Sequence, residues 1–178
     1  MKLTNRGKAI VAAAAIAGSA ALVPAVALAS SAAPQAPQVS RCALGSVLDW
    51  IADAPNGAAG TLYFPVEFTN VGPHACWLEG YPKVAGITSS IKQIGPAAGH
   101  FKATAHRVVL GHNQTAHALL GIVEAGIIAG CHGATGAGLS ITPPGVNDRQ
   151  FVFNFSFPAC KNKAYMHLYP VQPGIGVP

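Results

Sequence analysis

Hydrophobic and polar positions alternate most clearly between residues 61 and 69. Large apolar side chains stand at every second position, namely Leu62, Phe64, Val66 and Phe68. A period of two is the pattern of a strand with one buried face. We therefore predict a strand whose even-numbered positions face a core. Pro65 lacks a backbone N–H, which predicts an edge or bulge position for it.

Shorter apolar runs, each ended by glycine or proline, predict the remaining strands. They occupy residues 42–51, 76–81, 104–110, 114–124, 139–142, 151–157 and 165–171, with a hairpin and loop over 83–99. Residues 114–124 also fit a helical stripe, but the neighbouring strand patterns favour a strand. The phenylalanines at 151, 153, 155 and 157 predict a core-facing aromatic row. About seven to nine short strands predict an all-β fold, an immunoglobulin-like antiparallel β-sandwich.

The N-terminus predicts export. A head carrying Lys2, Arg6 and Lys8 precedes an apolar run over 9–23, and Ala27-Leu28-Ala29 supplies a small-x-small cleavage pattern. Residues 1–29 are therefore expected to be a Sec signal peptide. An uncleaved membrane anchor is the alternative, although Pro24 and the cleavage pattern favour removal. We expect no stable membrane span after cleavage.

Two further segments follow the signal peptide. Residues 30–41 are rich in alanine, proline, glutamine and serine, which predicts a disordered tether. Residues 42–178 have the length of a single domain. Cys42 follows Val-Ser-Arg, which is no lipobox. The expected location is therefore secreted or extracellular.

Charge excludes one class of partner. The whole chain has a formal net charge of +5. Beyond residue 29, eight Lys and Arg residues stand against six Asp and Glu residues, which leaves only +2. Nucleic-acid binding driven by bulk charge is not supported by so small an excess.

Four cysteines, all beyond the signal peptide, predict two disulfides. An even count in an exported chain is typical of disulfides, and four cysteines allow three pairings. Their order suggests nearest-neighbour pairs, Cys42–Cys76 and Cys131–Cys160. A zinc site is the alternative, but no Cys-x-x-Cys or clustered Cys/His spacing is present.

One group of ordered motifs is more specific. It includes Phe68-Thr-Asn70-Val-Gly72, then Cys76-Trp-Leu78-x-Gly80-Tyr81-Pro82, and later Ile-Thr-Pro-Pro-Gly over 141–145. With these motifs the chain, from Cys42 to its C-terminus, resembles an actinobacterial secreted family, the domain of unknown function 4232. The resemblance implies an exported or lipid-anchored envelope protein with a β-sandwich, and no established activity. The lipidated cysteine found in many such proteins is missing here.

Possible metal ligands and catalytic groups are scattered in the sequence. His100 and His106, and His112 and His117, lack the i, i+2 spacing that shares a strand face. A Cu or Zn site would need ligands from different strands, so scattered surface histidines are the simpler interpretation. No Gly-x-Ser-x-Gly motif occurs. Four carboxylates are of the residue type that could form an acid–base pair, but their spacing predicts no pair: Asp49, Asp53, Glu67 and Glu79.

One aromatic row is the candidate binding surface. Tyr165, His167 and Tyr169 alternate with Met166 and Leu168, so they are expected on the opposite strand face. An exposed row would suit a protein partner or a glycan, while a strand covered on both sides would not. Lys161 and Lys163 would add affinity for an anionic envelope polymer.

These patterns predict a secreted, non-enzymatic binding or interaction domain that needs no cofactor. Its partner would be an unidentified protein or envelope polymer. An extracytoplasmic metal-binding protein that uses the surface histidines is the second hypothesis, and a secreted hydrolase is the third.

Overall fold

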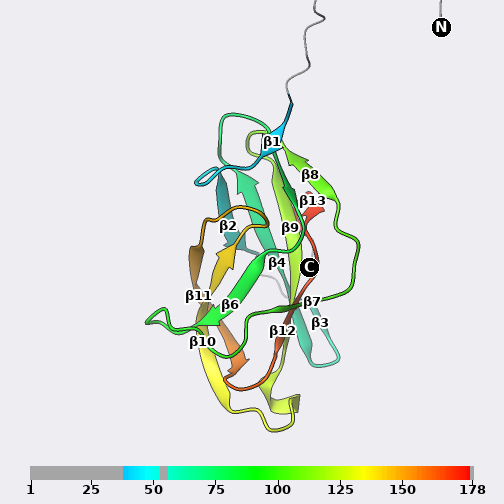
Figure 1. The fold of residues 1–178 in the computed structure, drawn as a ribbon. Helices are drawn as coiled ribbons and strands as arrows, with labels where there is room; N and C mark the ends of the chain where they lie inside the picture. Colours follow the sequence, from blue (N-terminus) through cyan, green and yellow to red (C-terminus); the bar gives the residue numbers. More distant parts are fainter. Residues whose placement is uncertain (1–37, 53–55, 177–178) are drawn as a thin grey trace, which may run out of the picture. The chain divides into compact units, whose positions relative to one another are not determined.

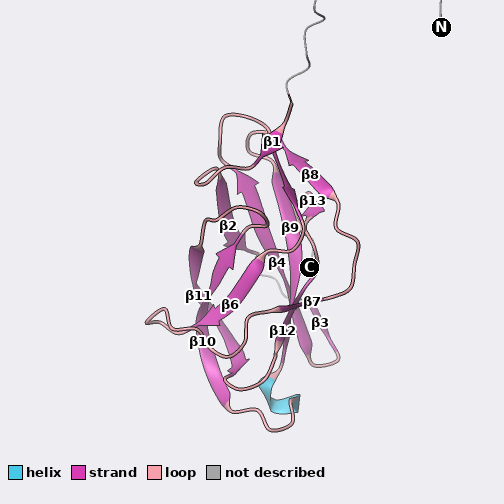
Figure 2. Cartoon of the chain, viewed as in Figure 1, coloured by secondary structure: helices cyan, strands magenta, loops and turns pink. Residues whose placement is uncertain are grey.

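A computed structural model describes residues 38–52 and 56–176. The predicted signal peptide and residues 30–37 of the predicted tether lie outside this part, as do Asp53 and the last two residues. The described residues form thirteen strands and one short 3-10 helix, η1 (Ala125–Ile127) (Figure 2). Eight of the strands are four residues or longer, in line with the predicted number.

The strands form three sheets (Figure 1). Sheet 1 runs in the order β2 (Val47–Ile51), β4 (Thr61–Asn70), β9 (Thr115–Val123), β12 (Met166–Leu168) and β7 (Gly99–His100), with β3 (Asn56–Ala58) on β4 and β13 (Gln172–Pro173) on β9. Sheet 2 runs β11 (Gln150–Cys160), β10 (Gly133–Thr142) and β6 (Lys83–Ile87). Sheet 3 runs β1 (Ser40–Arg41), β5 (Cys76–Glu79) and β8 (Arg107–Leu110).

The all-β sandwich is confirmed. Most strand pairs are antiparallel, but β1 with β5 and β12 with β7 are parallel. Both predicted disulfides are present, and each joins chain segments that are neighbours in one sheet. The disulfide of an antibody domain instead crosses between facing sheets. The immunoglobulin-like connectivity therefore stays a prediction.

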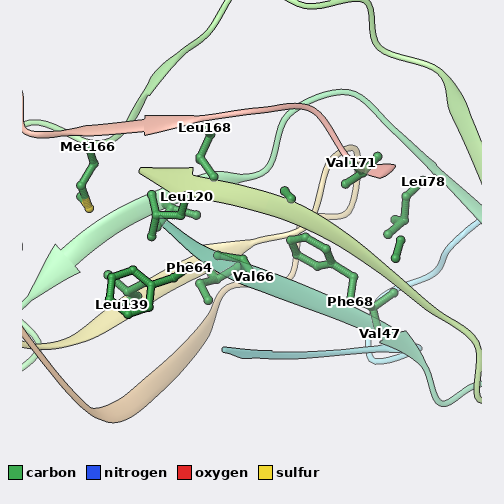
Figure 3. Close-up of a cluster of buried hydrophobic side chains, with 14 of the residues drawn as sticks. Val47, Phe64, Val66, Phe68, Leu78, Leu120, Leu139, Met166, Leu168 and Val171 are labelled. Atoms are coloured by element: carbon green, nitrogen blue, oxygen red, sulfur yellow. The ribbon is translucent and has the colours of Figure 1, made fainter. Parts of the chain in front are cut away.

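The core fills the space between the sheets. Phe64, Val66 and Phe68 of β4 are buried there, as the alternating pattern predicts. They belong to one cluster with Leu120 of β9 and Leu139 of β10 (Figure 3). Sheets 1 and 2 thus pack face to face, as in a β-sandwich.

Pro65 does not lie at an edge. Strand β4 is an inner strand, paired with β9 on one side and with β3 and then β2 on the other. Pro65 falls where the partner changes from β3 to β2, since β3 pairs up to Tyr63 and β2 starts at Val66. A residue that cannot donate is tolerated at such a gap in the ladder.

Asn70 joins sheet 1 to sheet 3. The chain leaves β4 for β5 here, and the turn from β8 to β9 passes beside it. The side-chain amide donates to the carbonyl oxygens of His74, Leu110 and Gly111 at 2.9, 3.0 and 3.2 Å. Its oxygen accepts from the backbone N–H of Gly72 at 3.0 Å. One fully buried amide therefore fixes two of the crossings between the two sheets, from β4 to β5 and from β8 to β9.

Replacement of Asn70 should lower stability strongly. Asn70→Ala leaves buried backbone groups in both turns without partners, so we expect a loss of about 2–4 kcal/mol in the free energy of unfolding. Urea denaturation followed by circular dichroism measures this loss. Val71→Ala at the exposed next position is the control and should change little. A loss below about 1 kcal/mol for Asn70→Ala would contradict this role.

Candidate functional site

A groove lies on the outer face of sheet 2. Its volume is about 240 Å³. Ala85 of β6 and Ser140 of β10 pair across its floor, and Thr142 of β10 follows at the next outward position. The alternating residues Leu139 and Ile141 are fully buried in the core. The strand period of two thus gives β10 an apolar inner face and a hydroxyl-bearing outer face.

The walls of the groove are apolar. Phe151 of β11 stands opposite Ser140 on one side. Ile91 stands on the other side, in the turn after β6 that Gln93 closes by bridging back to Ile87. Ile91 is 49 % exposed and has a φ of 62°. A β-branched residue with positive φ is rare and strained, and such strain clusters at functional sites.

Two cations line the groove. Lys83 begins β6 and Arg149 immediately precedes β11. Both side chains are exposed. Within residues 38–52 and 56–176, the ion pair is Arg107–Glu79, so neither groove cation has a carboxylate partner there. Among the described residues, no acidic side chain lines the groove. The arrangement favours an anionic ligand.

The predicted core row of phenylalanines is wrong for two of its four members. Phe151 and Phe153 are 39 % and 43 % exposed, whereas Phe157 is 4 % exposed. The cause is a register shift between β10 and β11, where Gly138 pairs with Phe153 but Gly136 pairs with Phe157. Asn154 adopts a φ of 60° within this shift. A β-bulge of this kind reorients the side chains of one strand relative to its partner.

The inner end of the row does reach the core. Phe155 packs edge-on against Phe64 with 4.7 Å between ring centroids. An added Cβ at Gly136 would overlap the ring of Phe157, and one at Gly86 would overlap the hydroxyl of Tyr165. These two glycines therefore make room for two aromatic side chains between the sheets.

The predicted row of Tyr165, His167 and Tyr169 is wrong at its first position. Tyr165 is fully buried, and its hydroxyl donates to the carbonyl oxygen of Ile94 at 3.0 Å. Burial raises the pKa of Tyr165 to about 12. His167 and Tyr169 are half-buried, and both pack on Phe101, with centroid distances of 5.2 and 4.5 Å.

The two lysines proposed for that surface lie elsewhere. Lys161 and Lys163 are exposed in the loop between β11 and β12. The backbone N–H of Lys161 donates to His132, and Lys163 lies beside Gly130. They therefore adjoin the segment around the Cys131–Cys160 disulfide.

The candidate metal ligands do not meet. His100 stacks on Tyr81 at 4.2 Å, His106 is exposed before β8, and His112 and His117 contact the carbonyl oxygens of Gly72 and Gly174, respectively. In the part of the chain that the structure describes, no group of three or more His, Cys, Asp or Glu side chains could hold a metal ion.

The candidate acids are also apart. Asp49 points into the core from β2, whereas Glu67 lies on the opposite face of sheet 1. Glu79 lies on sheet 3 beside Arg107. An acid–base pair of Asp49 and Glu67 is therefore excluded by the fold, and Asp53 lies outside the described residues.

Glu67 is covered by the C-terminal segment. Its side chain is fully buried, and Oε1 accepts from the backbone N–H of Gly176 at 2.9 Å. Burial raises the pKa of Glu67, while the Gly176 hydrogen bond and nearby His117 oppose that rise.

Comparison with protein-family models identifies the family of the chain. A family model described as a domain of unknown function (DUF4232) matches residues 42–172. The chain belongs to this family. Comparisons with curated proteins and with solved structures gave no match. Among the described residues of this DUF4232 domain, no helix is long and apolar enough to cross a membrane.

Sequence reasoning missed the groove. Lys83 and Arg149 are more than sixty positions apart, and only the pairing of β6, β10 and β11 brings them together. The register shift that exposes Phe151 and Phe153 leaves no clear signal in the sequence. Polar and aromatic residues still alternate through Asn154, and only the positive φ of Asn154 marks the shift. The sequence does carry a signal for a buried carboxyl beside the groove, because Asp49 alternates with the apolar residues Val47 and Ile51.

Asp49 lies at the seam between the two facing sheets. It is 5 % exposed, and neither carboxylate oxygen has a hydrogen-bond partner in the described part of the domain. The side-chain amide of neighbouring Gln150 bridges β11 to β2, because Nε2 donates to Val47 at 2.6 Å and Oε1 accepts from the Asp49 N–H at 3.2 Å. Burial, reinforced by the like charge of Asp148, raises the pKa of Asp49 to about 8.

Stability should therefore fall as the pH rises. The carboxyl of Asp49 has an ordinary pKa of 3.8 when unfolded and about 8 when folded, so unfolding releases its proton between these values. Its contribution to stability is full below pH 4 and is lost progressively up to pH 8. Asp49→Asn has no proton to lose, and we expect it to melt at least about 3 °C higher than the wild type at pH 7.

Calorimetric melting at pH 4 and pH 7 measures the effect. The gain from Asp49→Asn should shrink toward zero at pH 4. Asp148→Asn removes the neighbouring charge but keeps a side-chain oxygen that can accept from the backbone N–H of Gly45, as Asp148 does, so it should give a smaller gain at pH 7. A gain that is equal at both pH values would show that Asp49 does not titrate in this range.

Proposed function

We propose that this domain is an extracytoplasmic, non-enzymatic binding module that holds a segment of an acidic polysaccharide in the groove of sheet 2. One observation carries the proposal: Lys83, Arg149 and an exposed Phe151 line the same groove, and no carboxylate of the described residues lines it. The proposal keeps the expected class of partner, an envelope polymer, and moves the site from the predicted tyrosine row to sheet 2.

The groove offers three kinds of contact that suit a sugar acid. The two cations provide hydrogen bonds and charge for a carboxylate. The hydroxyls of Ser140 and Thr142 and the amide of Gln93 line the same groove and match sugar hydroxyl groups. The ring of Phe151 provides an apolar surface for the C–H face of a sugar ring.

The size of the groove supports a polymer segment. Pockets that enclose a drug-sized ligand are typically about 300–1,000 Å³. A groove of about 240 Å³ is smaller than that and fits one monomer-sized group. It would therefore hold one sugar unit of a longer chain.

The compartment supports the proposal as well. Two disulfides are typical of proteins that work in an oxidising, extracytoplasmic environment. The expected signal peptide and the family resemblance point to export from an actinobacterial cell. Many bacteria carry acidic wall or capsule polymers outside the cytoplasm. A domain that binds such a polymer needs no enzyme activity.

Binding to polygalacturonate, with neutral dextran as the comparison, tests the proposal. We expect calorimetric binding to polygalacturonate that weakens with salt, because the contacts are partly ionic. Phe151→Ala should weaken binding about threefold to tenfold through lost ring contact. The double variant Lys83→Ala with Arg149→Ala should weaken it at least about tenfold.

Matched controls separate the groove from the surface in general. Phe153→Ala removes an equally exposed ring that does not line the groove, and Lys161→Ala removes a cation elsewhere. Both should bind like the wild type. Absence of binding to polygalacturonate, or equal losses in the controls, would overturn the proposal.

A further inference from the structure

We infer that the outer face of sheet 3 carries a phosphate-binding site formed by Arg41, Trp77 and Arg107. This site shares no residue with the groove of sheet 2 and does not depend on the proposed function. It lies on strands β1, β5 and β8, with one residue of the site on each strand.

Strand order places the three side chains together. β5 lies between β1 and β8, so Arg41 and Arg107 approach Trp77 from opposite sides. The guanidinium carbon of Arg41 lies 4.2 Å from the indole centroid, and that of Arg107 lies 4.0 Å from it. Two cation–π contacts on one ring favour these positions of the two guanidinium groups.

Contact with the indole leaves hydrogen-bond donors of both guanidinium groups available, although Nη1 of Arg41 lies against Gly145. A stacked guanidinium uses its face, while its five N–H donors point outward in its plane. Arg41 has no carboxylate partner within residues 38–52 and 56–176. It also lies directly against Gly145, where an added Cβ would overlap the guanidinium, so its position is fixed on a second side.

Arg107 is only weakly neutralised. Its Nε lies 3.4 Å from Oε2 of Glu79, and both side chains are substantially exposed, at 56 % and 40 %. An exposed ion pair of this length contributes little and leaves the other donors of Arg107 available. Two like charges on one indole repel each other, and this repulsion is relieved when an anion binds.

The spacing favours a phosphate group. The two guanidinium carbons are separated by no more than the sum of their distances to the ring. A tetrahedral anion has oxygens pointing in several directions, so one anion beside the half-buried indole can accept hydrogen bonds from arginines that approach it from opposite sides. A carboxylate has only two oxygens in one plane and is used up by a single bidentate arginine.

Fluorescence of Trp77 provides the test. The chain has two tryptophans, and Trp50→Phe leaves Trp77 as the single reporter. Titration with sodium phosphate at constant ionic strength should change the emission saturably, whereas acetate and chloride should not. Calorimetry on the unsubstituted protein should give the same dissociation constant, which covers the case that Trp50→Phe disturbs the fold.

Variants identify the site. Arg41→Lys and Arg107→Lys keep the charge but lose the planar, bidentate donors, and we expect each to weaken phosphate binding at least about tenfold. Glu79→Gln removes the competing carboxylate and should tighten binding about twofold to fivefold. Lys92→Ala changes an exposed cation outside the site and should have no effect. Full affinity in the lysine variants would overturn the inference, because general surface charge would then explain binding.

Two further titrations identify the source of the phosphate. If phosphatidylglycerol vesicles sediment the protein and phosphatidylcholine vesicles do not, with the same dependence on Arg41 and Arg107, the site takes lipid headgroups. If phosphate binds and neither vesicle does, the site takes soluble or polymer-borne phosphate. If neither phosphate nor phosphatidylglycerol binds, the inference is wrong.

Discussion

The buried amide of Asn70 is the interaction on which the arrangement of the sheets depends. The chain crosses between sheets 1 and 3 four times, and two of these crossings, from β4 to β5 and from β8 to β9, pass this side chain. The amide satisfies carbonyl groups that a buried turn would otherwise leave without partners. The Cys42–Cys76 disulfide then joins the end of β1 to the start of β5. Trp77 follows Cys76 directly, so this disulfide also helps to place the Arg41–Trp77–Arg107 cluster.

Features of the fold could be predicted where they depend on the local sequence and not where they depend on pairing between strands. The period of two in β4 and β9 reports burial of one sheet face, so these strands and the burial of Phe64, Val66 and Phe68 were predictable. The disulfide pairs followed from cysteine order. In β11 the same period misleads, because a register shift relative to β10 changes which face the later side chains occupy. Register is set by pairing with another strand, which one sequence segment cannot report.

The candidate site was harder still to predict, because it consists of residues joined only by pairing between strands. The expected tyrosine row placed Tyr165 with His167 by counting positions, but Tyr165 precedes β12 and turns into the core toward Ile94. Lys83, Arg149 and Phe151 carry no motif, and each is ordinary in its own segment. The small net charge also hid the cations, since a balance over the chain says nothing about their clustering on two outer faces.

The seam between β2 and β11 places the buried carboxyl of Asp49 close to the candidate site. Gln150 takes the place of a strand partner for β2, since its amide both donates to Val47 and accepts from the N–H of Asp49. Arg149 and Phe151, which line the groove, are its immediate neighbours in the chain. The seam that positions them also buries Asp49 without a hydrogen-bond partner among the described residues. Local conflicts of this kind are expected mainly at functional or strained sites. Asp49 is therefore the position at which burial lowers the stability of the seam, beside residues that line the groove.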